Sequence, residues 1–159
     1  MTTTYRPIGF FRTPFTSIQG MPIQPIGGGA TEGTIEILPE FREGLTDLEG
    51  FSHIIVLYHF HKIEGYDLLV KPFLDTATHG IFATRSPKRP NPIGLSVMRL
   101  KAVHTDSLRL EGIDVLDRTP VVDIKPYVPD FDRYNAEKTG WFDGKSANAV
   151  SHLSDDRFA

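Results

Sequence analysis

Glycine and proline interrupt this chain too often to leave room for long helices. The 159 residues include 14 glycines and 12 prolines. Proline removes a backbone hydrogen-bond donor, and glycine lowers helix stability. Short runs rich in β-branched and aromatic residues lie between them, and such runs are typical of strands. The pattern therefore predicts an all-β domain with short helical turns and long loops.

Alternation of apolar and polar residues locates the expected strands. They cover residues 5–12, 34–38, 51–60, 92–103, 108–113 and 121–124. In the first, Ile8 and Phe10 share a face, and in the second Ile35 and Ile37 do. Residues 39–44 read as one helical turn, and residues 16–33 read as a long loop. No Gly-x-Gly-x-x-Gly stands between a strand and a helix, which disfavours a Rossmann fold.

Composition excludes several classes of protein. The chain has no cysteine, so it forms no disulfide, thiolate metal site or cysteine nucleophile. It lacks the apolar run of a signal peptide and any apolar stretch of membrane-spanning length. We therefore expect a cytoplasmic protein without a membrane partner. A net charge of −3 argues against broad, charge-driven binding of nucleic acid, and we expect no DNA partner.

Residues 82–94 form the most unusual segment. Its prolines fix the backbone in extended conformations, so the segment is predicted to be a stiff arm that carries Arg85, Lys88 and Arg89. Guanidinium groups on such an arm can grip a carboxylate or phosphate in bidentate fashion. A proline-rich surface loop with solvated charges explains the same residues equally well.

Three aspartates lie among apolar residues near the end of the chain. Asp114, Asp117 and Asp123 can bind ribose hydroxyls, an ammonium group or a metal, since a buried carboxylate needs a partner. The alternative is that they cap turns and form a surface pair between Asp123 and Lys125.

Three histidines share a face of the strand at residues 51–60 and its extension. His53, His59 and His61 show no conventional zinc spacing, so packing or hydrogen bonding is favoured for the first two. We expect no metal site.

Several motifs together resemble the TrmO family, also called YaeB-like or TsaA-like proteins. The resemblance runs from about residue 8 to residue 130. Its most specific parts are Arg89-Pro90-Asn91-Pro92-Ile93-Gly94 and Asp123-Ile124-Lys125-Pro126-Tyr127. The family consists of S-adenosylmethionine-dependent transfer-RNA methyltransferases that modify N6 of threonylcarbamoyladenosine next to the anticodon.

The resemblance implies a single-sheeted antiparallel β-barrel and a homodimer with the cofactor near the subunit interface. The barrel domain is expected over residues 1–135, and a tail over residues 136–159 packs on it or extends from it. S-adenosylmethionine is the implied cofactor. Carried over by motif, its contacts fall on Pro22, Ile23, Gln24, His61, Lys62, Arg85, Leu95, Leu116, Asp117, Arg118 and Thr119.

The implied acceptor nitrogen is urea-like and a poor nucleophile, so a base that removes its proton would help. Asp117, Asp123 and His61 are the candidates. Lys88 and Arg89 are the expected RNA contacts, on two arms that a homodimer places around one groove.

The chain departs from the family at three places. Arg118 stands where many relatives have glycine, and Ile23 stands where a basic residue is frequent. The chain also reads as a short form without the additional C-terminal domain of longer relatives. A methyltransferase of another RNA or of a small molecule, and a non-catalytic cofactor-binding module, therefore remain as alternatives.

Overall fold

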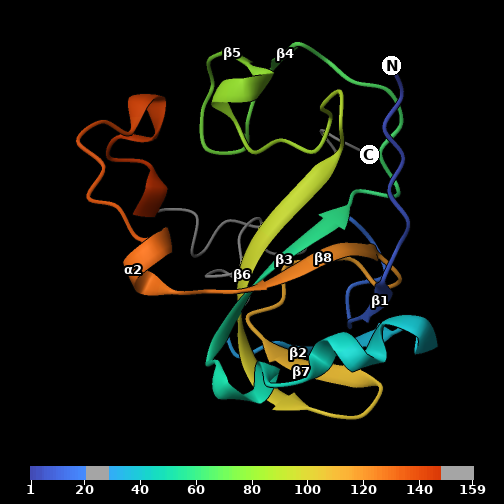
Figure 1. Ribbon diagram of the computed structural model, residues 1–159. Coiled ribbons are helices and arrows are strands. Elements are labelled where there is room, and N and C mark those ends of the chain that lie inside the picture. The colour runs from blue at the N-terminus through green and yellow to red at the C-terminus, as the bar shows by residue number, and fades with distance from the viewer. Residues whose placement is uncertain (21–28, 148–159) are drawn as a thin grey trace.

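A closed antiparallel barrel forms the body of the protein. The computed structural model describes residues 1–20 and 29–147. Six strands close in the order β1-β2-β7-β6-β3-β8 (Figure 1). Their bounds are β1 Gly9–Arg12, β2 Glu32–Ile37, β3 His53–His59, β6 Ile93–Val103, β7 Ser107–Glu111 and β8 Pro120–Pro126. The predicted all-β, single-sheeted barrel is confirmed, and each predicted strand has a counterpart. Closure leaves no strand of this sheet with an unpaired edge.

Helices are short throughout the described residues. The 3₁₀ helix η1 spans Pro39–Leu45, at the position of the predicted helical turn. The others are η2 Leu48–Gly50, η3 Ile81–Ala83, α2 Pro129–Asp132 and η4 Gly140–Phe142. A two-stranded hairpin of β4 Leu69–Val70 and β5 His79–Gly80 stands outside the barrel, and the sequence did not predict it. Within residues 1–20 and 29–147, no helix is long and apolar enough to cross a membrane.

Alternating residues of the strands fill the barrel. Ile35 and Ile37 of β2 share a face, as predicted, and this face points inward, as does the face of β7 that carries Leu108 and Leu110. On β1, however, Phe11 rather than Phe10 is fully buried. The register explains the difference, because Phe11 pairs with buried Ile35.

On β6 the buried face carries small and flexible residues. Gly94, Ser96 and Met98 point inward, whereas Leu95 is 54% exposed. A Cβ at Gly94 would overlap the ring of Tyr58 on the paired strand β3, so only glycine admits this packing. The apolar residues at odd positions of β6 therefore lie on the outside of the barrel near its start.

Candidate functional site

A turn at residues 116–119 leads into β8 and is bound to the neighbourhood of β1. The side chain of Asp117 accepts a hydrogen bond from the backbone of Thr13 at 3.1 Å. Backbone bonds fix the rest of the turn: Asp117 N to Phe15 O at 2.7 Å, Arg118 N to Phe11 O at 2.8 Å, and Thr119 N to Leu116 O at 3.3 Å. The turn is therefore a rigid platform at one end of the barrel.

Arg118 has a left-handed backbone, with φ of 61°. This conformation is unfavourable for residues with a Cβ and natural for glycine. It explains physically why glycine suits this position in the family motif. The side chain of Arg118 is 78% exposed, and its Nε lies 3.8 Å from Asp117 Oδ2.

His61 lies against this turn. Its Nδ1 is 3.2 Å from the hydroxyl of buried Thr119. Partial burial, together with the nearby charges of Lys62 and His59, lowers the pKa of His61, although Asp117 opposes the shift. The imidazole is therefore neutral at pH 7. Three of the predicted site residues, His61, Asp117 and Thr119, thus come together from distant parts of the chain.

The cationic arm, predicted to be extended over residues 82–94, instead begins in the 3₁₀ helix η3 and is non-helical over residues 84–94, where it is braced from within. Arg89 Nη1 donates to the backbone oxygen of Thr84 at 3.0 Å and to that of Ser86 at 3.2 Å. The Thr84 hydroxyl donates to Ile81 O and accepts from Ser86 N. The predicted stiffness of the arm is thus matched by hydrogen bonds that the sequence did not indicate. Arg89 is part of that bracing, whereas Arg85 is exposed.

A polar chain inside the barrel includes Asp114, one of the three aspartates that the sequence places among apolar residues, but its partners Ser96 and Tyr58 were not predicted. Ser96 Oγ donates to Asp114 Oδ1 at 2.9 Å and lies 3.0 Å from the hydroxyl of Tyr58. Since serine has one proton, Tyr58 donates to Ser96 when Asp114 is ionised.

Electrostatics connect this chain to the arm. Burial raises the pKa of Asp114 to about 7, against the lowering effects of Ser96 and Arg85. Burial and the charge of Asp114 also raise the pKa of Tyr58, which the charge of Arg85 opposes. Arg85 therefore lies within electrostatic reach of both groups. The ionised form of Asp114 and the cation of Arg85 stabilise each other.

Asp123 lies apart from the other candidates. Its carboxylate is 2.6 Å from Lys125 Nζ and accepts a hydrogen bond from Ile124 N. It lies in the middle of β8 and lines a hollow of about 420 Å³ beside η1 and η2, which none of residues 116–119 lines. The pairing with Lys125 matches the surface-pair alternative.

The remaining predicted residues fall in three groups. Leu95 is 54% exposed on the outer face of β6, and its neighbour Ile93, which was not a predicted site residue, is 40% exposed. Lys62 is exposed beside His61, and Lys88 is half-buried on the arm. Pro22, Ile23 and Gln24 lie outside the described residues.

Histidine packing differs along β3 and beyond it. His53 Nδ1 bonds to the Ser52 hydroxyl at 2.9 Å, and its ring contacts Tyr127 edge-on, as expected for a hydrogen-bonded histidine. His59 is exposed, contrary to the expectation of a packed side chain. Among residues 1–20 and 29–147, no cluster of three or more potential ligands could hold a metal ion.

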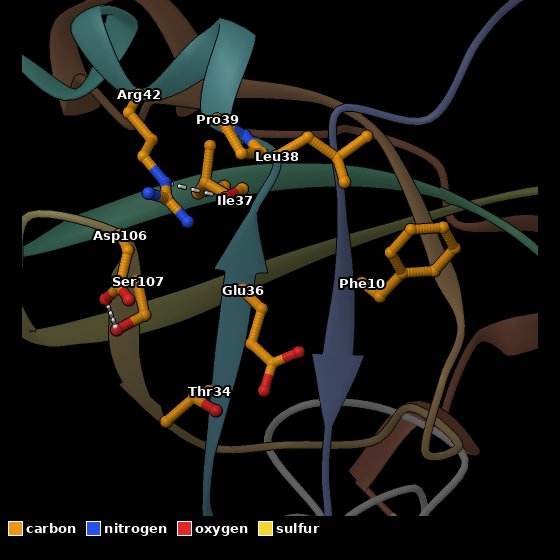
Figure 2. Close-up of a pocket in the computed structure, with 9 residues that line it drawn as sticks. All are labelled: Phe10, Thr34, Glu36, Ile37, Leu38, Pro39, Arg42, Asp106 and Ser107. Atoms are coloured by element: carbon orange, nitrogen blue, oxygen red, sulfur yellow. Dashed lines mark hydrogen bonds between the residues drawn. The ribbon is translucent and has the colours of Figure 1, made fainter.

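A second hollow, of about 340 Å³, lies against β1, β2 and η1 (Figure 2). Figure 2 shows Arg42 reaching from η1 toward the strand, and its Nε donates to Ile37 O at 3.2 Å. Phe10, Glu36 and Asp106 also line it. None of the predicted site residues does, so this hollow is distinct from the 116–119 turn.

Comparison with known proteins agrees with the motif resemblance. The family model described as the tRNA-methyltransferase O N-terminal domain matches residues 10–133. A probable S-adenosyl-L-methionine-binding protein of Pyrococcus abyssi is 48% identical over 152 residues, which cover 96% of this chain and 82% of that protein. The mouse tRNA (adenine(37)-N6)-methyltransferase is 38% identical over 133 residues, 79% of this chain and 31% of that enzyme.

Comparison with solved structures points to the same family as the family model. A crystal structure of TrmO from Pseudomonas aeruginosa matches with a TM-score of 0.74 and 41% identity, over 89% of this chain and 63% of that one. The chain thus spans less than two thirds of that structure and of several relatives. The family model nevertheless covers most of the 159 residues. The chain therefore belongs to the family of the tRNA-methyltransferase O N-terminal domain.

Proposed function

We propose that this protein is an S-adenosylmethionine-dependent methyltransferase that acts on transfer RNA. The observation that carries the proposal is the meeting of His61, Asp117 and Thr119 at one turn of a family barrel. Relatives with this domain are named as S-adenosylmethionine-binding proteins and as methyltransferases of adenine 37 in transfer RNA. The proposed acceptor is N6 of threonylcarbamoyladenosine next to the anticodon.

The donor set at the site fits the cofactor. Exposed Arg85 offers a guanidinium for the carboxylate of the methionyl part, and the half-buried carboxylate of Asp117 can accept hydrogen bonds from hydroxyl or ammonium groups. Exposed Leu95 offers an apolar surface for an adenine ring. Among the described residues, Ser86 Oγ is the buried side-chain polar atom without a hydrogen-bond partner, and it lies next to Arg85.

Proton removal from the acceptor nitrogen is assigned to His61. The cofactor supplies an activated methyl group on a sulfonium, so the protein has to align the acceptor and to accept its proton. A lowered pKa keeps the imidazole of His61 neutral and able to act as a base. In the tautomer whose Nδ1–H donates to Thr119, the Nε2 atom is free to take the proton. Asp117 then stabilises the imidazolium that forms.

A homodimer is part of the proposal. Ile93 and Leu95 expose apolar surface on the outer face of β6, directly after the cationic arm. Pairing of two subunits through Ile93, with Leu95 left to the cofactor at the edge of the interface, would bring two arms toward one groove. Doubling the local positive charge in this way would give the acidic chain a phosphate-binding surface with Lys88 at its centre.

Transfer of labelled methyl groups tests the activity. The protein is incubated with cofactor labelled in its methyl group and with transfer RNA from cells that have or lack the threonylcarbamoyl modification. Label only in the modified transfer RNA supports the full proposal. Label in both kinds points to another base, label only in small molecules points to another acceptor, and binding without transfer points to a binding module.

Two substitutions separate the cofactor from the RNA. Arg85→Ala removes a charge-assisted contact, so affinity for S-adenosylmethionine should fall roughly 10- to 100-fold in calorimetry. Lys88→Ala should leave that affinity unchanged. It should reduce the salt dependence of transfer-RNA binding, because binding with one phosphate contact fewer releases fewer counterions. Unchanged cofactor affinity in Arg85→Ala, or identical salt dependence in Lys88→Ala, would refute the respective assignment.

A further inference from the structure

The segment that follows the family domain packs against the base of the cationic arm. The family match ends at residue 133, and η4 with Trp141 lies beyond it. The Trp141 ring stacks on His79 of β5, with centroids 4.5 Å apart and an interplanar angle of 14°. Phe142 stacks on Trp141 in turn, at 3.8 Å. Figure 1 shows this orange-to-red segment rising beside the β4–β5 hairpin.

A hydrogen bond connects this segment to the chain just before the arm. Trp141 Nε1 donates to the backbone oxygen of Ala83 at 2.7 Å. Ala83 is the last residue of η3, where a carbonyl has no partner within the helix. The indole therefore caps η3 at its C-terminal end. Arg85 follows two residues later, so the bond fixes the backbone from which that side chain extends.

An ion pair holds the other end of the segment. Lys145 Nζ lies 2.9 Å from Asp75 Oδ1, while His79 Nε2 lies 2.8 Å from Asp75 Oδ2. The backbone of Thr76 donates to the same carboxylate at 2.7 Å. These hydrogen bonds lower the pKa of Asp75 and keep its carboxylate ionised, and the bonds from Lys145 and His79 have the largest effect. Asp75 thus joins the segment to the same histidine on which Trp141 stacks.

The arm itself behaves as one stiff unit, because Arg89 braces it at Thr84 and Ser86. Its orientation depends on its two ends and on the backbone bond that Asp67 N donates to Lys88 O at 3.2 Å. One end continues into β6 of the barrel, and the other end is η3. Two hydrogen bonds hold η3: Ile81 N donates to Leu68 O, and Trp141 Nε1 donates to Ala83 O. Among the described residues, Trp141 is a contact from outside the matched family domain that acts on the η3 end of the arm.

We propose that Trp141 and Lys145 are positioning residues that clasp η3 and the β4–β5 hairpin, and so hold Arg85 in place for the cofactor carboxylate. The inference rests on the proposed function, since it names Arg85 as a cofactor contact. It adds residues outside the matched domain to the machinery of cofactor binding. Trp141 acts through the backbone at Ala83, and Lys145 acts through Asp75 and His79, on which Trp141 stacks.

Substitution at Trp141 and Lys145 tests the clasp. Trp141→Phe keeps an aromatic ring on His79 and removes only the bond to Ala83, so the Kd for S-adenosylmethionine should rise about 2- to 10-fold. Lys145→Ala should raise it as well, and Lys145→Arg should restore it. Lys138→Ala, an exposed lysine earlier in the same segment, is the matched control and should bind as the wild type does. The KM for the cofactor should rise with little change in kcat, because the reacting groups at His61 are untouched.

Hydrogen exchange separates this inference from the proposed function. In Trp141→Phe, amides of residues 84–94 should exchange faster while those of β7 stay unchanged, with or without cofactor. If the wild type binds no cofactor, the proposed function fails, and so does the role of Trp141 in positioning Arg85 for the cofactor. Faster exchange of the arm amides in Trp141→Phe would then still show that Trp141 holds the arm in place. Unchanged exchange in the arm, or faster exchange with unaltered cofactor affinity, would overturn the assignment of Trp141 as a positioning residue.

Discussion

Replacement of Asp114 by asparagine should stabilise the folded protein above neutral pH. The pKa of Asp114 is about 7 in the folded state, against an ordinary value of 3.8. Between these values the folded protein holds a proton that the unfolded chain has released. The free energy of unfolding therefore falls as pH rises through this window and levels off above the folded pKa.

The size of the effect follows from the same two values. Each pH unit between them corresponds to about 1.4 kcal/mol, so the ionised carboxylate of Asp114 costs at most about 4 kcal/mol above pH 7. Asparagine has nearly the same shape and still accepts a hydrogen bond from Ser96, but it carries no charge into the barrel. Its advantage over aspartate should be absent near pH 4 and largest near pH 8.

Urea denaturation across this pH range provides the assay. The difference in unfolding free energy between wild type and Asp114→Asn should widen by about 1.4 kcal/mol per pH unit and then become constant. Ser96→Ala is the companion variant. It removes a hydrogen bond that lowers the pKa of Asp114, so its pH dependence should extend to higher pH.

The reasoning would be refuted if the difference in unfolding free energy between wild type and Asp114→Asn stayed constant with pH. It would also be refuted if the wild type became more stable relative to the variant as pH rises. A carboxylate that costs stability is typical of a functional site.

Three further substitutions test the local packing. Arg118→Gly should stabilise the protein by about 1 kcal/mol, because glycine adopts the left-handed backbone without strain; a lower urea midpoint would contradict this. Gly94→Ala should cost about 1–3 kcal/mol through overlap with the ring of Tyr58, seen as a lower Tm, and an unchanged Tm would disprove the close packing. Arg89→Met should lose both hydrogen bonds that Nη1 donates, about 1–2 kcal/mol, and speed amide exchange in the arm; equal exchange would show that the brace is dispensable.

The sequence alone determined the architecture and the family. Strand alternation is a local property, so the pairs Ile35 with Ile37 and Leu108 with Leu110 each share a strand face by residue pattern alone, and both pairs are buried in the barrel. The prolines of residues 87–92 likewise predicted a stiff arm, since proline acts on its own backbone and on the residue before it. The motifs at residues 89–94 and 123–127 identified the family because they are long and specific.

Only the tertiary structure decided which side chains work together. Ser96 and Asp114 are 18 positions apart, and Trp141 is 58 positions from Ala83. The face of β6 that turns inward depended on the space that Gly94 leaves for Tyr58, and Arg89 proved to be a brace of its own arm rather than a freely presented cation. Such contacts follow from strand register and barrel closure, which arise from packing across the whole chain and which no local pattern of residues specifies.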